Sequence, residues 1–156
     1  MAELSAATGL QKASLYYRFP RGKAQMADET LGFVDKWFVK NVFSALTSSG
    51  QPHDRVATMC ESIRCFFEGG AKSCPLEALS LGHAEGIIQD HLQATFNAWK
   101  IGLSNVIAET GRDGLESNAI AEQIIAIIEG SLIVRRLAPD SEVFERSLQQ
   151  VLRMMA

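Results

Sequence analysis

The chain has 156 residues, of which 47% are hydrophobic and 21% are charged, and its formal net charge is −3 at pH 7. This composition is typical of a soluble globular protein that can bury a core without disulfides or metal ions. The sequence has neither a run of about eighteen apolar residues nor a basic and apolar N-terminal leader. We therefore expect no membrane partner, no secretion and a cytoplasmic location.

Three cysteines, Cys60, Cys65 and Cys74, are an odd number without a CxxC pair, which favours a reducing compartment over a disulfide framework. We expect them to be buried as small hydrophobic side chains, and thiol sensing is the alternative. The histidines are too scattered for a familiar metal-ligand set, and no nucleophile and base motif or phosphate-binding glycine loop occurs. We expect no metal, no cofactor and no enzyme activity.

Residues that favour helices recur throughout the chain, and β-branched alternation is absent, so the sequence predicts an all-α fold. A first helix is expected to stop at Gly9, and a short helix over 11–18 must end at Phe19-Pro20, because proline disfavours helical conformation in the preceding residue. Apolar residues at helical spacing predict further helices over the following ranges: 23–46, 53–68, 75–82, 90–109, 117–137 and 140–155.

Residues 4–19 fit a helix-turn-helix, in which a glycine-containing turn joins two helices and the second helix enters the major groove of DNA. Three apolar side chains are expected to pack the two helices together: Ala6, Leu10 and Leu15. Hydrogen-bonding side chains are left on the outer face: Lys12, Ser14, Tyr16 and Arg18. Between Leu4 and Ala27 there are four basic and no acidic residues, which leaves 11 basic and 18 acidic residues elsewhere. Such asymmetry is typical of a small DNA-facing module on a larger body.

This segment resembles the TetR family of transcriptional regulators through AATGL at 6–10, SLYYRF at 14–19 and the turn before Lys23. The turn FPRGK at 19–23 and the stretches CPLE at 74–77 and IEGSL at 128–132 resemble the branch that contains LmrA-type repressors. The resemblance implies that these residues bind DNA: Lys12, Ser14, Tyr16, Tyr17, Arg18 and Lys23. For the two tyrosines, packing on the fold is the alternative.

Family members begin with a further helix that packs over the helix-turn-helix, and Met1 falls where that pattern would lie inside the second helix. We therefore expect the chain to begin partway through the DNA-binding domain, with a truncated helix-turn-helix domain followed by a helical ligand-binding and dimerisation domain. The expected boundaries are 1–46 for the DNA-binding segment with its connecting helix and 47–156 for the second domain. The alternative is a truncated ligand-binding or interaction module without DNA binding.

A region rich in large and adaptable side chains follows the connecting helix. The resemblance implies a pocket for a small hydrophobic effector, and plain core is the alternative for any one residue. The expected ligand-binding residues are Met59, Ile63, Phe66, Phe67, Leu79, His83, Phe96 and Trp99. We expect a ligand-responsive repressor that binds double-stranded operator DNA and is released from it when the effector binds.

A single recognition helix reads only a few base pairs, so we expect a homodimer that presents two of them. The helices over 117–137 and 140–155 are too apolar to cover only the core of their own chain. The expected interface residues are Ile124, Ile128, Gly130, Leu132, Phe144, Leu148 and Val151. Simple burial of these helices is the alternative.

Overall fold

The architecture is taken from a computed structural model that describes residues 2–75 and 86–155. These ranges are helical and contain no strand, which confirms the all-α prediction. The elements are α1 (Ala2–Thr8), α2 (Lys12–Arg18), α3 (Lys23–Phe38), a π-helical turn η1 (Val39–Phe43), α4 (Ser44–Thr47), α5 (Pro52–Phe66), α7 (Ile87–Ala108), α8 (Gly114–Leu137) and α9 (Val143–Arg153). Most of the helix expected over 75–82 lies outside the described residues.

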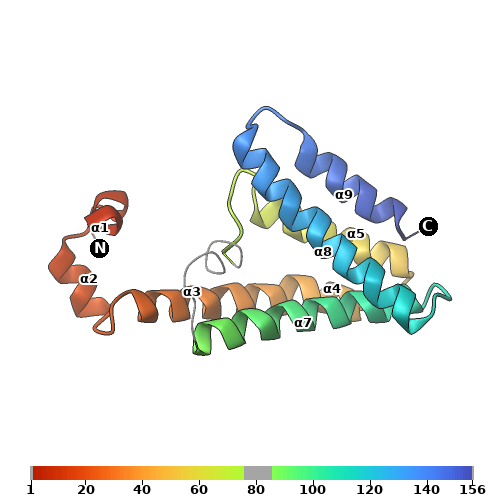
Figure 1. Cartoon of the computed structure of the whole chain (residues 1–156), viewed down its shortest axis with the longest axis horizontal. Helices are drawn as coiled ribbons and strands as arrows, with labels where there is room; N and C mark the ends of the chain where they lie inside the picture. Colours follow the sequence, from red (N-terminus) through yellow and green to blue (C-terminus); the bar gives the residue numbers. More distant parts are fainter. Residues whose placement is uncertain (1, 76–85, 156) are drawn as a thin grey trace.

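The helices form an elongated body with a small appendage (Figure 1). Helix α3, η1 and α4 follow one another as one long helix, and α7 runs alongside it. Helix α8 packs against both α7 and α9, while α5 contacts α4, α7 and α9. Helices α1 and α2 lie at the end of α3 that is farthest from α8 and α9. This arrangement sets the segment with the predicted DNA-binding residues apart from the body.

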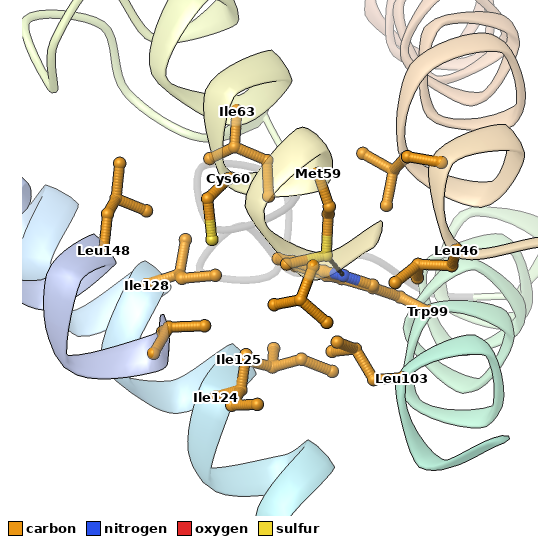
Figure 2. Close-up of a cluster of buried hydrophobic side chains, with 14 of the residues drawn as sticks. Leu46, Met59, Cys60, Ile63, Trp99, Leu103, Ile124, Ile125, Ile128 and Leu148 are labelled. Atoms are coloured by element: carbon orange, nitrogen blue, oxygen red, sulfur yellow. Dashed lines mark hydrogen bonds between the residues drawn. The ribbon is translucent and has the colours of Figure 1, made fainter. Parts of the chain in front are cut away.

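The core forms because each long helix turns one apolar stripe inward. Along the α3 to α4 helix, buried side chains recur at spacings of three and four residues: Leu31, Val34, Phe38, Val42 and Leu46. Figure 2 shows the region where this stripe meets the other helices, with Met59 and Ile63 of α5, Trp99 and Leu103 of α7, and Ile124 of α8 drawn together. The centre of the body is therefore a shared apolar core.

Two helix starts differ from the expected boundaries for local reasons. Helix α8 begins at Gly114 rather than near residue 117, because the Asp113 carboxylate accepts a hydrogen bond from the Glu116 amide at 2.9 Å and caps the helix. Helix α9 begins at Val143 rather than near residue 140, after a turn in which the Ser141 hydroxyl accepts from the Val143 amide at 3.2 Å. The periodicity located both helices, and the caps determine where they start.

The turn after α5 needs glycine. Gly70 has φ of +87°, and a Cβ added there would lie 3.0 Å from Phe144 of α9 and 3.1 Å from the Arg135 side chain. A left-handed backbone and a close approach both exclude larger residues at this position. Gly70 therefore lets the end of α5 pack directly against α8 and α9.

Helix α8 is a long and apolar element of the body. Its 24 residues are long and apolar enough to cross a membrane by length and composition alone. In this fold α8 packs between α7 and α9 and carries seven buried residues, as expected for the central helix of a bundle. This packing accounts for the buried part of its apolar surface, while apolar side chains at both of its ends stay exposed.

Candidate functional site

The candidate DNA-binding segment consists of α1, a turn at Gly9 and α2. Gly9 has φ of +69°, a left-handed conformation that glycine adopts without a Cβ penalty, so the chain turns sharply between the two helices. The Ser5 hydroxyl donates to the Leu10 carbonyl across this turn. Leu15 is buried as expected, whereas Ala6 and Leu10 are exposed. The expected three-residue contact is therefore reduced to Leu15 in this structure.

All six predicted DNA-binding side chains are exposed to solvent: Lys12, Ser14, Tyr16, Tyr17, Arg18 and Lys23. Tyr17 is 91% exposed, so its ring does not pack against the described residues in this structure. The Arg18 guanidinium lies 5.7 Å from the centre of the Phe19 ring, a cation–π contact that holds it at the end of α2. The outer surface of α2 thus carries cationic and hydroxyl groups that suit phosphate and base-edge contacts.

Four of the predicted ligand-binding residues are core residues in this structure. Met59, Ile63, Phe67 and Trp99 are at most 1% exposed, and the Trp99 indole N–H donates to the Met59 sulfur at 3.4 Å. Figure 2 shows three of these four side chains within the apolar cluster. In this structure these four side chains pack with one another in the apolar core, and their contact with an effector stays a prediction.

Phe66 and Phe96 are the predicted ligand-binding residues that reach the surface. Phe66 is partly buried at the end of α5, and Phe96 is 39% exposed on α7, where the Lys100 ammonium lies 5.9 Å from its ring centre. Leu79 and His83 lie outside the described residues.

Two adjoining hollows meet at Phe66, and we refer to them together as the aromatic groove. One has a volume of about 520 Å³ and is lined by Trp37, Asn41, Thr58, Glu61, Ser62, Cys65 and Phe66. The other has about 470 Å³ and adds Phe33, Lys72, Ser73 and Pro75 to the shared residues Trp37, Cys65 and Phe66. The Trp37 and Phe66 rings stack with centres 4.1 Å apart. The groove therefore offers aromatic walls with amide, hydroxyl and carboxylate groups at its edge, as small-molecule sites do.

A polar cluster joins α3 to α7, and the sequence reasoning missed it. The Asp35 carboxylate accepts from the Thr95 hydroxyl at 2.8 Å, and its other oxygen contacts Nε2 of His91. The signal in the sequence was an acidic residue within the apolar stripe of the long helix, next to Val34 and three residues before Phe38. A charge in such a position usually has a partner.

Six of the seven predicted interface residues are buried within the single chain. They are at most 1% exposed: Ile124, Ile128, Leu132, Phe144, Leu148 and Val151. This corrects the residue assignment, because these side chains hold α8 and α9 onto the body. Gly130 is partly exposed, and a Cβ added there would meet nothing within 4 Å. The exposed apolar side chains at the end of α8 are Ile133, Val134 and Leu137.

Comparison with known proteins gives the same architecture. Residues 52–150 match the family described as the transcriptional regulator LmrA/YxaF-like, C-terminal domain. The HTH-type transcriptional regulator LmrA of Bacillus subtilis is 22% identical over 143 residues, which cover 86% of this chain and 73% of LmrA. The uncharacterized HTH-type transcriptional regulator YxaF of the same organism is 21% identical over 131 residues, which cover 81% of this chain and 69% of YxaF.

A crystal structure of a TetR transcriptional regulator from Legionella pneumophila has the same fold, with a TM-score of 0.80, 22% identity and coverage of 99% of this chain and 85% of that chain. The all-helical body with α1 and α2 at the end of a long helix, together with these relatives, defines a helix-turn-helix transcriptional regulator. The chain belongs to the TetR family, and its C-terminal part is of the LmrA/YxaF-like type.

Proposed function

We propose that this protein is a cytoplasmic, dimeric repressor that binds operator DNA through α2 and releases it when a small apolar effector binds to the body. The observation that carries the proposal is the exposed polar face of α2, held apart from the body at the end of α3. The four basic and no acidic residues between Leu4 and Ala27 supply an attraction to phosphates despite the net charge of −3.

The exposed side chains divide into two roles. Lys12, Ser14 and Tyr16 carry donors and acceptors that suit base edges, with lysine able to bond the O6 and N7 acceptors of guanine. Tyr17 and Lys23 suit the phosphate backbone, where a contact positions the protein without selecting a sequence. Arg18 supplies a further cation at the end of α2.

Dimerisation follows from the need for two recognition helices. The exposed apolar residues Ile133, Val134 and Leu137 and the open surface at Gly130 support a partner on the outer side of α8. Two copies related by a twofold axis would then present α2 to successive turns of a palindromic site.

The aromatic groove supports the effector site. Its stacked Trp37 and Phe66 rings suit a planar apolar molecule, and Asn41 and Ser62 at its edge suit a polar substituent. Trp37 and Asn41 belong to the same long helix that carries α2, so a ligand there would favour one position of that helix over another. Effector binding thereby changes the spacing of the two recognition segments and releases DNA.

Binding to a duplex from the promoter region of the gene itself tests the proposal. We expect preference for this duplex over random DNA in a gel-shift assay, with an affinity that falls steeply as salt rises. Lys23→Ala should weaken binding to every duplex and reduce the salt slope by about 0.9 for each phosphate that the variant no longer neutralises. Ser14→Ala should mainly reduce the preference between duplexes.

Arg146→Ala is the matched control, because it removes one exposed positive charge from α9 without touching the α2 surface. It should leave both affinity and salt slope nearly unchanged. Equal binding of the wild type to promoter and random duplexes at physiological salt would contradict the proposal and favour a ligand-binding module.

A further inference from the structure

Asp35 lies where α3 meets α7, and both of its carboxylate oxygens are engaged by α7. One oxygen accepts from the Thr95 hydroxyl at 2.8 Å, and the other contacts Nε2 of His91. We propose that this Asp35–His91–Thr95 cluster positions the DNA-binding segment by fixing the direction in which α3 leaves the body. The effect of the cluster on the direction of α3 is independent of the proposed function, whereas its effect on DNA affinity rests on that function.

The three side chains of the cluster are partly or fully buried. Thr95 is 6% exposed, and the side chains of Asp35 and His91 are 31% and 27% exposed. A partly buried carboxylate loses part of its hydration, so hydrogen bonds from neighbouring donors offset that loss. Because hydrogen bonds are directional, they fix the rotation of α3 against α7 in a way that apolar contacts alone do not.

The place of the cluster along the helix explains why it can act on α2. Leu31 is the first buried residue of α3, and residues 23–30 are exposed or only partly buried. Beyond Asp35 the same helix is held by the core, where the Phe38 and Trp99 rings lie 5.3 Å apart. The Asp35 cluster is therefore a polar contact within the first part of α3 that the body holds, about one turn after Leu31, where the buried part of the helix begins.

The π-helical turn Val39–Phe43 begins four residues after Asp35. Single π turns inside α-helices are frequently found at functional sites, because they interrupt the regular hydrogen-bond ladder. Val39 and Phe43 also line a shallow groove of about 360 Å³ together with Asp35, His91 and Thr95. An irregular turn and a directional contact thus lie side by side where the long helix joins the body.

A matched pair at position 95 tests the inference. Thr95→Val keeps the shape and removes the donor to Asp35, whereas Thr95→Ser keeps the hydroxyl. Hydrogen–deuterium exchange is followed in the full chain for peptides within residues 23–34 and within α8. We expect exchange in 23–34 to be on the order of tenfold faster in Thr95→Val, unchanged in α8, and restored to near the wild-type rate in Thr95→Ser.

Asp35→Leu removes the same contact from the α3 side. It should also make hydrogen–deuterium exchange faster in residues 23–34. In gel shifts with the promoter-region duplex, Thr95→Val should bind about tenfold more weakly than Thr95→Ser. If 23–34 exchanges at the wild-type rate in Thr95→Val, or if α8 loses protection to the same degree, the positioning role is overturned. If the wild type binds no duplex, the proposed function fails, and the exchange comparison still decides the role of the cluster.

Discussion

At the scale of single residues, burial raises the pKa of the Cys60 thiol from 9.0 to about 12, and the nearby Arg64 and Glu61 charges act in opposite directions on it. Cys74 is also buried, whereas Cys65 is exposed in the aromatic groove, with its sulfur 3.6 Å from a Glu61 carboxylate oxygen. The expectation that all three cysteines are buried is therefore wrong for Cys65. Cys65 is exposed because it lies at the end of α5 on the side that faces solvent.

Thiol alkylation should separate Cys60 from Cys65. At pH 8 the folded protein should react with iodoacetamide at Cys65 and not at Cys60, because the raised pKa keeps Cys60 protonated and burial blocks access. Peptide mass spectrometry after a timed reaction measures this. In urea both should react at similar rates, and modification of Cys60 as fast as Cys65 in the native protein would show that the core is open.

Trp99 should behave as a core residue rather than as the wall of a pocket. Trp99→Ala removes a side chain that is 1% exposed, so we expect a loss of about 3 to 5 kcal/mol in the free energy of unfolding. Phe96→Ala on the same helix is the matched control, because its ring is 39% exposed, and it should cost much less. Urea denaturation followed by circular dichroism measures both, and equal losses would contradict the burial difference.

At the scale of elements, Arg55 ties three helices together. Its side chain is 10% exposed, its Nε donates to the Leu46 carbonyl at 3.0 Å, and its Nη1 donates to the Glu109 carboxylate at 2.7 Å. The Leu46 carbonyl belongs to the last turn of α4, which has no further helix to satisfy it. A side chain of α5 therefore caps α4 and holds the end of α7 near it.

Removing this cap should destabilise the body. We expect Arg55→Met to lower the free energy of unfolding by about 1.5 to 3 kcal/mol, because it leaves a partly buried carbonyl and a carboxylate without their donor. Glu109→Gln keeps the cap on Leu46 and should cost under about 1 kcal/mol, since Glu109 is half exposed. Thermal unfolding of the two variants measures both losses of stability. A larger loss in Glu109→Gln than in Arg55→Met would contradict the role of Arg55 as a cap.

Several helices and one exposed face could be predicted from the sequence. The spacing of Leu31, Val34, Phe38, Val42 and Leu46 was enough to predict the long helix, and the exposed face of α2 followed from the helix-turn-helix pattern. Periodicity could not tell which part of the wide apolar stripe of α8 faces its own core and which faces outward. That depends on how α7 and α9 pack around it, so the periodicity did not show that Ile128 is buried within the chain while Leu137 is exposed.

The Asp35 contact was beyond sequence reasoning for a related reason. Its partners, His91 and Thr95, are 56 and 60 residues away in the chain. An acidic residue on an apolar stripe indicates that a partner exists, but only the packing of α3 against α7 identifies it. Similarly, Trp37 and Phe66 form one wall only because the two helices that carry them lie together.

At the scale of the whole molecule, the proposed dimer interface lies on the outer surface of α8. Leu137 is 80% exposed and Val134 is 45% exposed near its C-terminal end, and Leu115 is 86% exposed at its opposite end. An exposed apolar strip next to Gly130 is a typical dimer surface. Leu137 is exposed over most of its side chain, so we expect that it can be changed without unfolding the single chain.

Leu137→Glu should convert the dimer to a monomer without loss of helical content, because the charge would be buried without a partner in the interface. Leu115→Glu is the matched control at the other end of the helix and should leave the dimer intact. Light scattering coupled to gel filtration at micromolar concentration measures both. A wild type that runs as a monomer, or a Leu115→Glu variant that dissociates as readily, would contradict the proposed position of the interface.

The length of α3 between its first residue, Lys23, and the Asp35 contact has a mechanical consequence. Twelve residues separate Asp35 from Lys23, and at 1.5 Å per residue they make an arm of about 18 Å. A tilt of only about 10° at the body would move the tip of that arm by about 3 Å, close to the 3.4 Å rise between successive bases. If α2 binds operator DNA as proposed, a small angular change at the body would therefore shift each recognition helix by a distance comparable to one base step.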